Sequence, residues 1–313
     1  MALKKVPTHI ADRRTRRRLV RKHWQFYMFC ALPVAYLVIF KYIPMVGAQI
    51  AFRDFNPILG MWKSEWIGAR EFVRFFNSPS FWTLIRNTFF ISLLRLGLGF
   101  PAPILLAIML NEVRNRAFKR TVQMVTFAPH FISTVVMVAV IITVLSPRVG
   151  LAGRVMAFFG TAPYDLLSVA DNFRMIFVVS EVWQHMGYES IIYIAALSSV
   201  NPELYDAAKI DGASRLKKIR YIDIPSIMPT IVILLILNFG EIMNVGFEKI
   251  YLMQNPLNLA TSEIIQTYVY KVGLINANFS FGTAVGLFNS VINFLLLVAV
   301  NQVARRISET SLW

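Results

Sequence analysis

Polar and ionisable side chains recur at helical spacing inside several apolar stretches of the chain. Gln184 and Tyr188 lie four residues apart, as do His185 and Glu189, so each pair would share one face of a helix. Ionisable groups at membrane depth are costly and usually face a helix bundle or a water-filled cavity. Such groups could bind a polar solute, or they could serve as hydrogen-bond partners between helices. The residues that could line a path for such a solute through the membrane, called the path residues below, are Gln184, His185, Tyr188, Glu189, Asn238, Glu241, Asn244, Asn289 and Asn293.

A second set of residues with a specific pattern lies between two apolar stretches, from 201 to 225. Asn201 can cap a helix, and Glu203 suits its first turn, where the helix dipole favours an acidic residue. Gly212 is expected to end that helix, because glycine readily takes the left-handed conformation that follows a helix. A second amphipathic helix follows, and Pro225 marks the start of the next apolar stretch. The segment is therefore predicted to form two short helices.

The elements that must position these residues are membrane-spanning helices. The chain has 313 residues, of which 56% are hydrophobic and only 16% charged, which excludes an ordinary soluble protein. The apolar stretches are long enough for a span, which needs about 20 residues, and they lack strand-like alternation. We predict an all-α polytopic bundle with about six spans, at 24–46, 87–110, 121–146, 173–199, 226–247 and 281–303. The domains are a basic segment, 1–23, and a membrane domain, 24–313, which contains the loop 200–225.

The basic residues indicate which way the protein faces. The net charge is +15, and the segments before span 1, between spans 2 and 3, between spans 4 and 5, and after span 6 hold 9, 4, 5 and 2 of the 32 lysines and arginines. By the positive-inside rule both termini face the cytoplasm. The arginine-rich run before span 1 could bind nucleic acid, but a topogenic segment held by anionic membrane lipid is the favoured interpretation, so we expect no nucleic-acid partner. Cys30 is the single cysteine, so the redox compartment cannot be read from it.

The segment 201–225 resembles a signature of the permease subunits of bacterial ABC importers. That signature has an acidic residue, two alanines, a glycine four positions after the second alanine, and a hydrophobic-x-hydrophobic-proline close. Matching positions here are Asp206, Ala207, Ala208, Gly212, Ile222, Ile224 and Pro225. Asp211 begins a DGAS run that is usual in sugar permeases. One departure is Asp206, where the family usually has glutamate, and the shorter side chain reduces the reach of the carboxylate.

The resemblance implies that this loop is a coupling helix, inserted into a cleft of a separate ATP-hydrolysing subunit. Asp206 could pair with a basic side chain of that partner, the two alanines allow close backbone approach, and Gly212 supplies a bend. The alternative is an ordinary amphipathic helix on the membrane surface. The implied coupling residues are Glu203, Asp206, Ala207, Ala208, Asp211, Gly212 and Pro225.

No catalytic or nucleotide-binding motif occurs in the sequence. No glycine is followed by lysine, so there is no Walker A phosphate loop, and the four histidines are dispersed. We therefore expect a non-catalytic subunit without a cofactor or metal of its own, with ATP and Mg²⁺ on a partner ATPase. The resemblance implies a bacterial inner-membrane complex of this chain with a second, homologous permease subunit, two ATP-binding subunits and an extracytoplasmic solute-binding protein.

Further segments resemble the LplB-type branch of carbohydrate permeases, namely 51–60, 99–115, 127–136, 255–274 and the terminal SLW. That branch serves oligosaccharides and polysaccharide fragments and includes the bacterial alginate importer, so alginate is one candidate substrate. The path residues would then hydrogen-bond sugar hydroxyls, and Tyr188 would stack on a sugar face. Arg95 could attract an acidic substrate, although a buried pairing with a carboxylate is the plainer interpretation.

One alternative belongs to a different class, an ion-coupled secondary transporter that acts alone. Such a protein is expected to show repeat-related halves with interrupted helices near the bilayer midplane. The sequence has no convincing internal repeat, so the importer subunit is favoured.

Overall fold

The computed structural model describes residues 22–307. Most of the basic segment 1–23, with its arginine-rich run, lies outside the described residues, and so does the terminal SLW. The described chain is helical except for connecting segments and one short antiparallel pair, β1 (Arg53–Asp54) with β2 (Glu65–Trp66). The predicted all-α class is therefore confirmed.

Within residues 22–307, four continuous helical stretches are long and apolar enough to cross a membrane. They are Trp24–Phe52, Phe81–Glu112, Arg215–Gly240 and Phe279–Arg305. Their elements are α2 (Trp24–Leu37), η1 (Val38–Tyr42), α3 (Ile43–Met45), η2 (Val46–Phe52), α6 (Phe81–Leu94), η3 (Arg95–Gly99), α7 (Pro101–Glu112), α13 (Arg215–Lys218), η6 (Ile219–Asp223), α14 (Ile224–Gly240) and α18 (Phe279–Ile307).

The third predicted span, 121–146, is bent rather than straight. Helix α8 (Arg116–Phe127) continues into the 3₁₀ turn η4 (Ala128–Phe131), and α9 (Thr134–Leu145) then departs at 106°. Pro129 lacks a backbone N–H and so cannot continue the helical hydrogen bonding. Ser133 restarts it, because its hydroxyl accepts a hydrogen bond from Val136 N. Counted as one span, this bent pair gives five candidate spans rather than the six expected.

The fourth predicted span corresponds to α11 (Ala170–Ser198), a single helix of 29 residues. It is long enough to cross a membrane but is not among the helices that are apolar enough, because polar residues such as Glu181 and Glu189 interrupt it.

The fifth predicted span begins earlier than expected. The helix runs without a break from Arg215 to Gly240, and Pro225 lies in the first turn of α14 after the π-helical segment η6.

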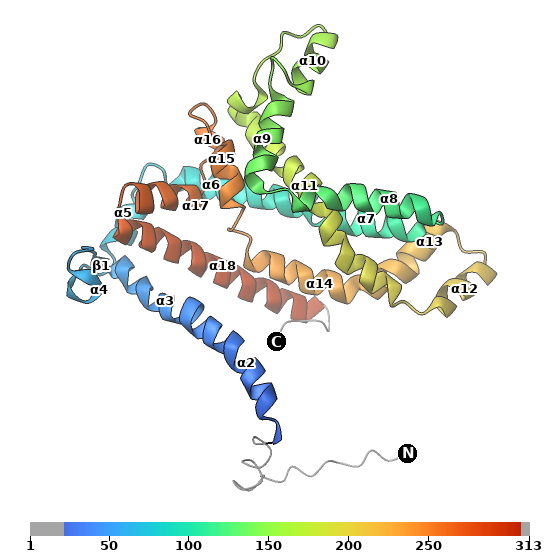
Figure 1. The fold of residues 1–313 in the computed structure, drawn as a ribbon, viewed down its shortest axis with the longest axis horizontal. Helices are drawn as coiled ribbons and strands as arrows, with labels where there is room; N and C mark the ends of the chain where they lie inside the picture. Colours follow the sequence, from blue (N-terminus) through green and yellow to red (C-terminus); the bar gives the residue numbers. More distant parts are fainter. Residues whose placement is uncertain (1–21, 308–313) are drawn as a thin grey trace.

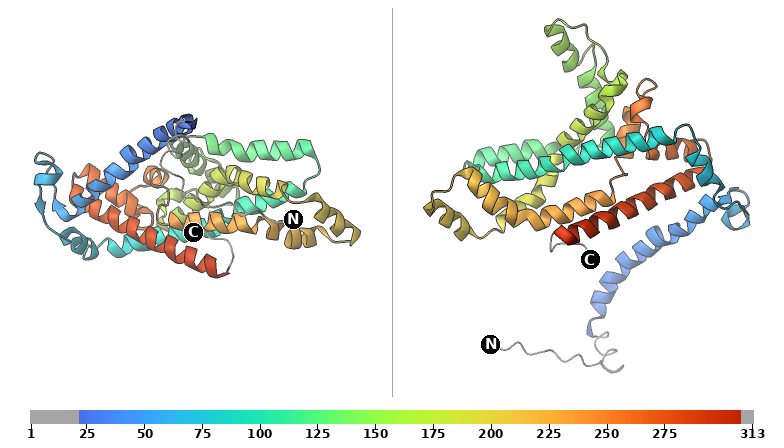
Figure 2. Two further views of the ribbon diagram at one scale, coloured as in Figure 1. Left: turned by 90° about the horizontal axis from the view of Figure 1, so that it is seen from below. Right: turned by 180° about the vertical axis from the view of Figure 1, so that it is seen from behind.

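The spans form an elongated bundle (Figures 1 and 2) in which α11 packs against α7 and α8, and α14 packs against α18. One core cluster joins α11 to α9 and α15 through Phe173, Phe177, Met137 and Ile250. Helix α2 stands apart from the bundle and has no buried residue.

The two ends of the bundle differ. One end carries β1, β2 and short helices, and the opposite end carries α12 (Pro202–Ile210) and α13 (Figure 1). The remaining elements are α4 (Gly60–Lys63), α5 (Arg70–Phe76), α10 (Leu151–Phe158), η5 (Leu166–Ser168), α15 (Phe247–Met253), α16 (Leu259–Ser262), α17 (Ile265–Val269) and η7 (Tyr270–Ile275).

Candidate functional site

The loop between α11 and α14 forms the two short helices that its sequence predicts. The Asn201 side chain accepts a hydrogen bond from Glu203 N at 3.0 Å and so caps α12. Gly212 has a φ of +66°, and its N–H donates to Lys209 O at 3.1 Å. This is the left-handed residue that ends a helix, a conformation that costs glycine little. The second helix, α13, is capped by Ser214 and runs directly into α14.

The loop exposes most of its signature residues. Glu203, Asp206, Ala207, Asp211 and Gly212 are exposed, as is Pro225 at the start of α14, while Ala208 is half-buried. The Asp206 carboxylate lies 2.7 Å from the Lys209 ammonium, and both side chains are about two-thirds exposed. An exposed pair of this kind is weak, so Asp206 remains available to a partner.

Two contacts fix the loop on the bundle, and neither was predicted. The Tyr205 hydroxyl donates to Asp223 Oδ1 at 2.5 Å, which ties α12 to the buried start of the following span. Burial, and then the hydrogen bond to Asp223, raises the pKa of Tyr205 to about 12. On the other side, Lys218 and Arg215 lie 3.8 Å and 4.0 Å from the carboxylate of Glu112, at the end of α7. The loop is thus braced against two spans.

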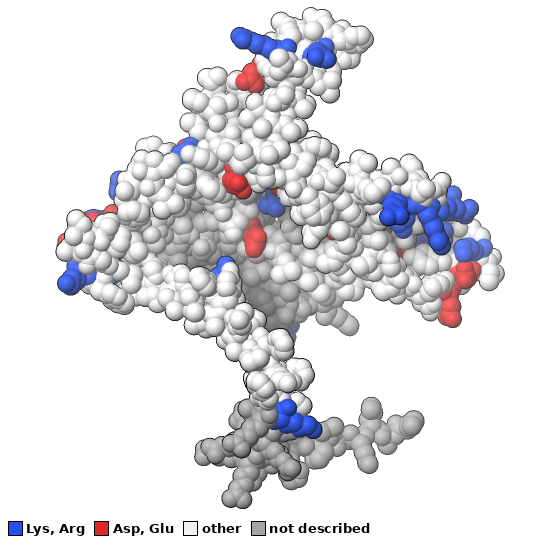
Figure 3. Space-filling model, in the orientation of Figure 1, with Lys and Arg blue, Asp and Glu red and all other residues white. Residues whose placement is uncertain are grey.

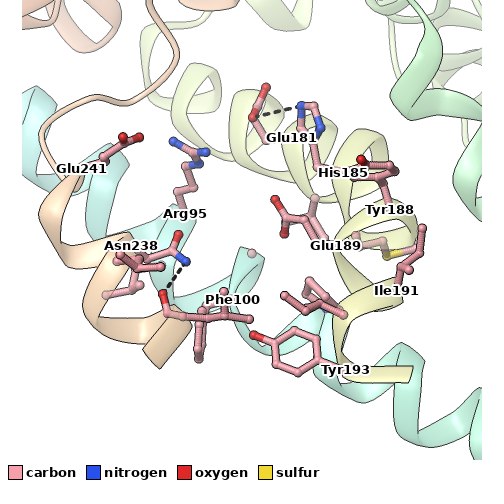
Figure 4. A pocket seen from close by; sticks show the side chains of 18 of the residues that line it. Arg95, Phe100, Glu181, His185, Tyr188, Glu189, Ile191, Tyr193, Asn238 and Glu241 are labelled. Carbon is pink, nitrogen blue, oxygen red and sulfur yellow. Dashed lines mark hydrogen bonds and ion pairs between the residues drawn. The ribbon is translucent and has the colours of Figure 1, made fainter. Parts of the chain in front are cut away.

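A cavity of about 880 Å³ lies between α6–α7, α11 and α14. Five predicted path residues line it, namely His185, Tyr188, Glu189, Asn238 and Glu241. Figure 4 shows Glu189 and Arg95 pointing into the space that these walls enclose. The cavity also has apolar and aromatic lining, such as Phe100 and Tyr193, a mixture that suits a polar solute with apolar faces.

The other four predicted path residues do not line the cavity. Asn289 and Asn293 of α18 both donate to Asn244 Oδ1, at 3.2 and 3.3 Å, and Asn293 also accepts from Met243 N at 3.0 Å. Gln184 accepts from Lys249 Nζ at 2.9 Å and is buried. These amides join helices to one another, which is the alternative role that the sequence left open.

The structure does not show the buried pairing of Arg95 with a carboxylate that was the plainer interpretation of its sequence position. Within residues 22–307 its guanidinium forms no ion pair with a carboxylate. Arg95 Nη1 donates a hydrogen bond to the Asn244 carbonyl oxygen at 3.2 Å. Arg95 lines the cavity and is half-buried, so the guanidinium keeps donors available to a solute.

A chain of polar groups extends from the cavity wall on α11, and its links to Lys249 and His130 were not predicted. Lys249 is 3% exposed, and its ammonium lies 3.0 Å from Glu181 Oε1. Glu181 Oε2 lies 3.7 Å from His185 Nε2, and His185 Nδ1 lies 3.0 Å from His130 Nδ1. The chain thus connects α15, α11 and the bend at η4. Across the described residues, no group of three or more His, Cys, Asp or Glu is arranged to hold a metal ion.

Comparison with known proteins decides which transport class this architecture belongs to. A family model described as "binding-protein-dependent transport system inner membrane component" matches residues 99–309. The chain belongs to this family. It is therefore an inner-membrane component of a transport system, and the membrane-spanning helices agree with that location. Membership also favours the importer subunit over a secondary transporter acting alone.

Relatives of this permease transport sugars. It is 39% identical over 307 residues to the polygalacturonan/rhamnogalacturonan transport system permease YteP of Bacillus subtilis, covering 97% of this chain and 96% of the relative. It is 40% identical over 295 residues to protein LplB of the same organism, covering 94% and 92%. A solved bacterial ABC transporter for import of the acidic polysaccharide alginate matches with a TM-score of 0.86 at 38% identity, covering 93% of this chain and 98% of that one. The chain is thus similar to ABC importer permeases, and the relatives whose names give a substrate act on polysaccharides.

Proposed function

We propose that this permease is the membrane-spanning subunit of an ATP-driven importer of oligosaccharides or polysaccharide fragments. The cavity would carry the sugar, and the loop 200–225 would receive the movement of a partner ATPase that holds ATP and Mg²⁺. The substrates named for YteP and for the alginate transporter are polysaccharides, which supports a substrate of this class. Alginate is one candidate.

The observation that carries the proposal is a direct mechanical connection between the loop and the cavity. Helix α12 follows α11, whose His185, Tyr188 and Glu189 line the cavity. The helix that leaves the loop is unbroken from Arg215 to Gly240 and contributes Asn238 to the opposite wall. Because both walls end in one braced loop, a displacement of α12 changes the separation of the walls.

The partners follow from the same arrangement. A second permease would cover the side of the bundle from which α2 stands apart, and two ATPases would engage this loop and its counterpart. An alginate transporter has been solved in complex with an alginate pentasaccharide-bound periplasmic protein, and this permease matches it with a TM-score of 0.87 at 37% identity. A solute-binding protein would accordingly deliver sugar at the end of the bundle that carries β1 and α5. Both termini would then face the cytoplasm.

The test is sugar uptake by the reconstituted complex of both permeases, the ATPases and the binding protein. We expect Asp206→Lys and Gly212→Val to abolish uptake and sugar-stimulated ATP hydrolysis while the protein still inserts. Asp206→Lys reverses the charge offered to the ATPase, and Gly212→Val strains the left-handed turn, although no atom lies within 4 Å of the position of an added Cβ. Asp206→Glu, which keeps the exposed negative charge at the same position, is the matched control and should leave uptake unchanged.

Normal uptake in both loop variants would contradict the coupling role. Uptake that persists without ATP, and that collapses when a proton or sodium gradient is removed, would instead support the secondary transporter.

A further inference from the structure

Positively charged side chains gather beside the coupling loop. Figure 3 shows them over α8 and α13, next to the acidic residues of α12. The group is defined here as the basic belt and consists of Arg114, Arg116, Lys119, Arg120, Lys217 and Arg220. None of the six forms an ion pair with a carboxylate within residues 22–307.

Glu112 brings the two halves of the belt together. Its carboxylate lies 3.8 Å from Lys218 on α13, and Arg114 follows two residues later in the chain. The Glu112 carboxylate is already shared by Lys218 and Arg215, which are not members of the belt. The belt therefore concentrates positive charge that the described chain does not neutralise, so it fits an anionic partner.

The surface of α8 indicates which kind of anion. Arg116, Lys119 and Arg120 are spaced three and four residues apart and share one face of the helix. Phe118 and Val125 lie seven residues apart on the other side and are 58% and 67% exposed. No residue of α8 is buried. Because α8 is the first half of the bent candidate span, its cations lie where that span begins, beside exposed apolar side chains. This arrangement suits the boundary between lipid headgroups and acyl chains.

The adjoining coupling helix has the opposite character. It exposes Glu203 and Asp206, and Asp211 follows it, so the surface proposed to meet the ATPase is acidic where the belt is basic. A single protein partner would need an acidic surface for the belt and a basic surface for α12 within a short distance of each other. Two separate partners, one for the basic belt and one for the acidic helix, meet this requirement more simply.

We propose that the basic belt binds the phosphate groups of anionic phospholipids in the cytoplasmic leaflet and thereby holds the coupling loop at a fixed depth. This inference rests on the orientation in the proposed function. Juxtamembrane cations contribute about 1 kcal/mol each to binding at an anionic membrane surface. Removal of two should therefore weaken binding about 30-fold, the equivalent of about 2 kcal/mol.

The experiment measures phosphatidylglycerol retained by the complete transporter in native mass spectrometry, after transfer from bilayers of phosphatidylcholine and phosphatidylglycerol. We expect Arg116→Gln with Arg120→Gln to lose most retained phosphatidylglycerol, and Arg116→Lys with Arg120→Lys to restore it. The matched control is Arg148→Gln with Arg154→Gln, which removes two exposed arginines from the connection to α10 and from α10 itself. That control should retain lipid as the unmodified protein does.

Equal retention by the glutamine variant and the unmodified protein overturns the proposal, as does an equal loss in the control. Loss of the ATPase subunits with unchanged lipid retention also overturns it, and assigns the belt to the ATPase. Lipid retention is measured without ATP or sugar, so its failure leaves the import function standing. Conversely, normal uptake by the coupling-loop variants would not alter the lipid result.

Discussion

At the scale of single residues, the contact between Tyr205 and Asp223 is the point where the coupling loop meets the spans. Asp223 is fully buried, and its second carboxylate oxygen, Oδ2, has no hydrogen-bond partner among the described residues. Tyr205→Phe would therefore leave the carboxylate without its hydroxyl donor. A buried group left unsatisfied costs about 1–3 kcal/mol. We expect a lower unfolding temperature and reduced uptake, measured against Tyr221→Phe, which changes an exposed tyrosine on the same segment.

The pH dependence of that difference can also be predicted. A tyrosine has a pKa of about 10 in an unfolded chain, and burial raises the pKa of Tyr205 to about 12. Because the folded pKa is the higher one, the stabilisation is fully present below about pH 10 and is lost as pH rises through about 12. The gap in unfolding temperature between Tyr205→Phe and the unmodified protein should thus stay constant at neutral pH. A gap that changes around neutrality would contradict the assignment of the donor.

Arg95 gives a prediction about substrate selection. Its guanidinium lines the cavity and forms no ion pair with a carboxylate within residues 22–307. Charge-assisted hydrogen bonds contribute about 1.5–3 kcal/mol, so Arg95→Gln should reduce uptake of an acidic oligosaccharide by tenfold or more. Uptake of a neutral oligosaccharide should fall less. The control is Arg86→Gln on α6, the helix that leads into η3, and Arg86 does not line the cavity. Equal losses for both sugars in Arg95→Gln would argue against a role in recognising charge.

At the scale of elements, α11 packs tightly against α8 at Gly187. A Cβ added there would lie 2.0 Å from the carbonyl oxygen of Thr126, a backbone atom at the end of α8. Gly187→Ala must therefore push α8 and the bend away from the cavity wall. Overpacking costs about 1–3 kcal/mol, so we expect lower thermal stability and lower uptake. Gly286→Ala in α18 is the control, because nothing lies within 4 Å of its added Cβ, and it should be neutral in both assays.

Local and distant contacts explain which elements could be predicted from the sequence. The ends of α12 are set by residues within the loop, Asn201 and Gly212, so the prediction of two short helices agrees with the structure. The position of the next span was less accurate, because the helix continues through Pro225. Helical spacing places Asn289 and Asn293 on one face but cannot show whether that face meets a cavity or another helix.

The missed parts of the site depend on contacts between distant segments. Lys249 contacts Glu181, which lies 68 residues earlier in the chain, and Arg95 contacts the carbonyl of Asn244 on another element. A lone lysine in a short outer segment carries no local signal of burial. Pro129 indicates a break in the helix at η4, but the angle of the bend depends on packing against α11.

At the scale of the whole molecule, the distribution of charge and the position of the loop lead to one orientation. The basic belt and the coupling helix lie at the same end of the bundle, and β1, β2 and α5 lie at the other (Figures 1 and 3). Positive charge is retained on the cytoplasmic side of inner-membrane proteins. The proposed partner ATPase would also work in the cytoplasm, so both arguments support the proposal that α12 lies on that side.

This orientation can be tested by thiol labelling, since Cys30 is the single cysteine and can be replaced by serine. In that background Glu65→Cys should react with a membrane-impermeant maleimide in right-side-out membranes, because Glu65 is exposed at the end proposed to face outward. Asp211→Cys, exposed on the coupling loop, should react only after the membrane is permeabilised. The reverse pattern would place the loop outside, beyond the reach of ATP, and would contradict both the proposed coupling and the lipid contact of the belt.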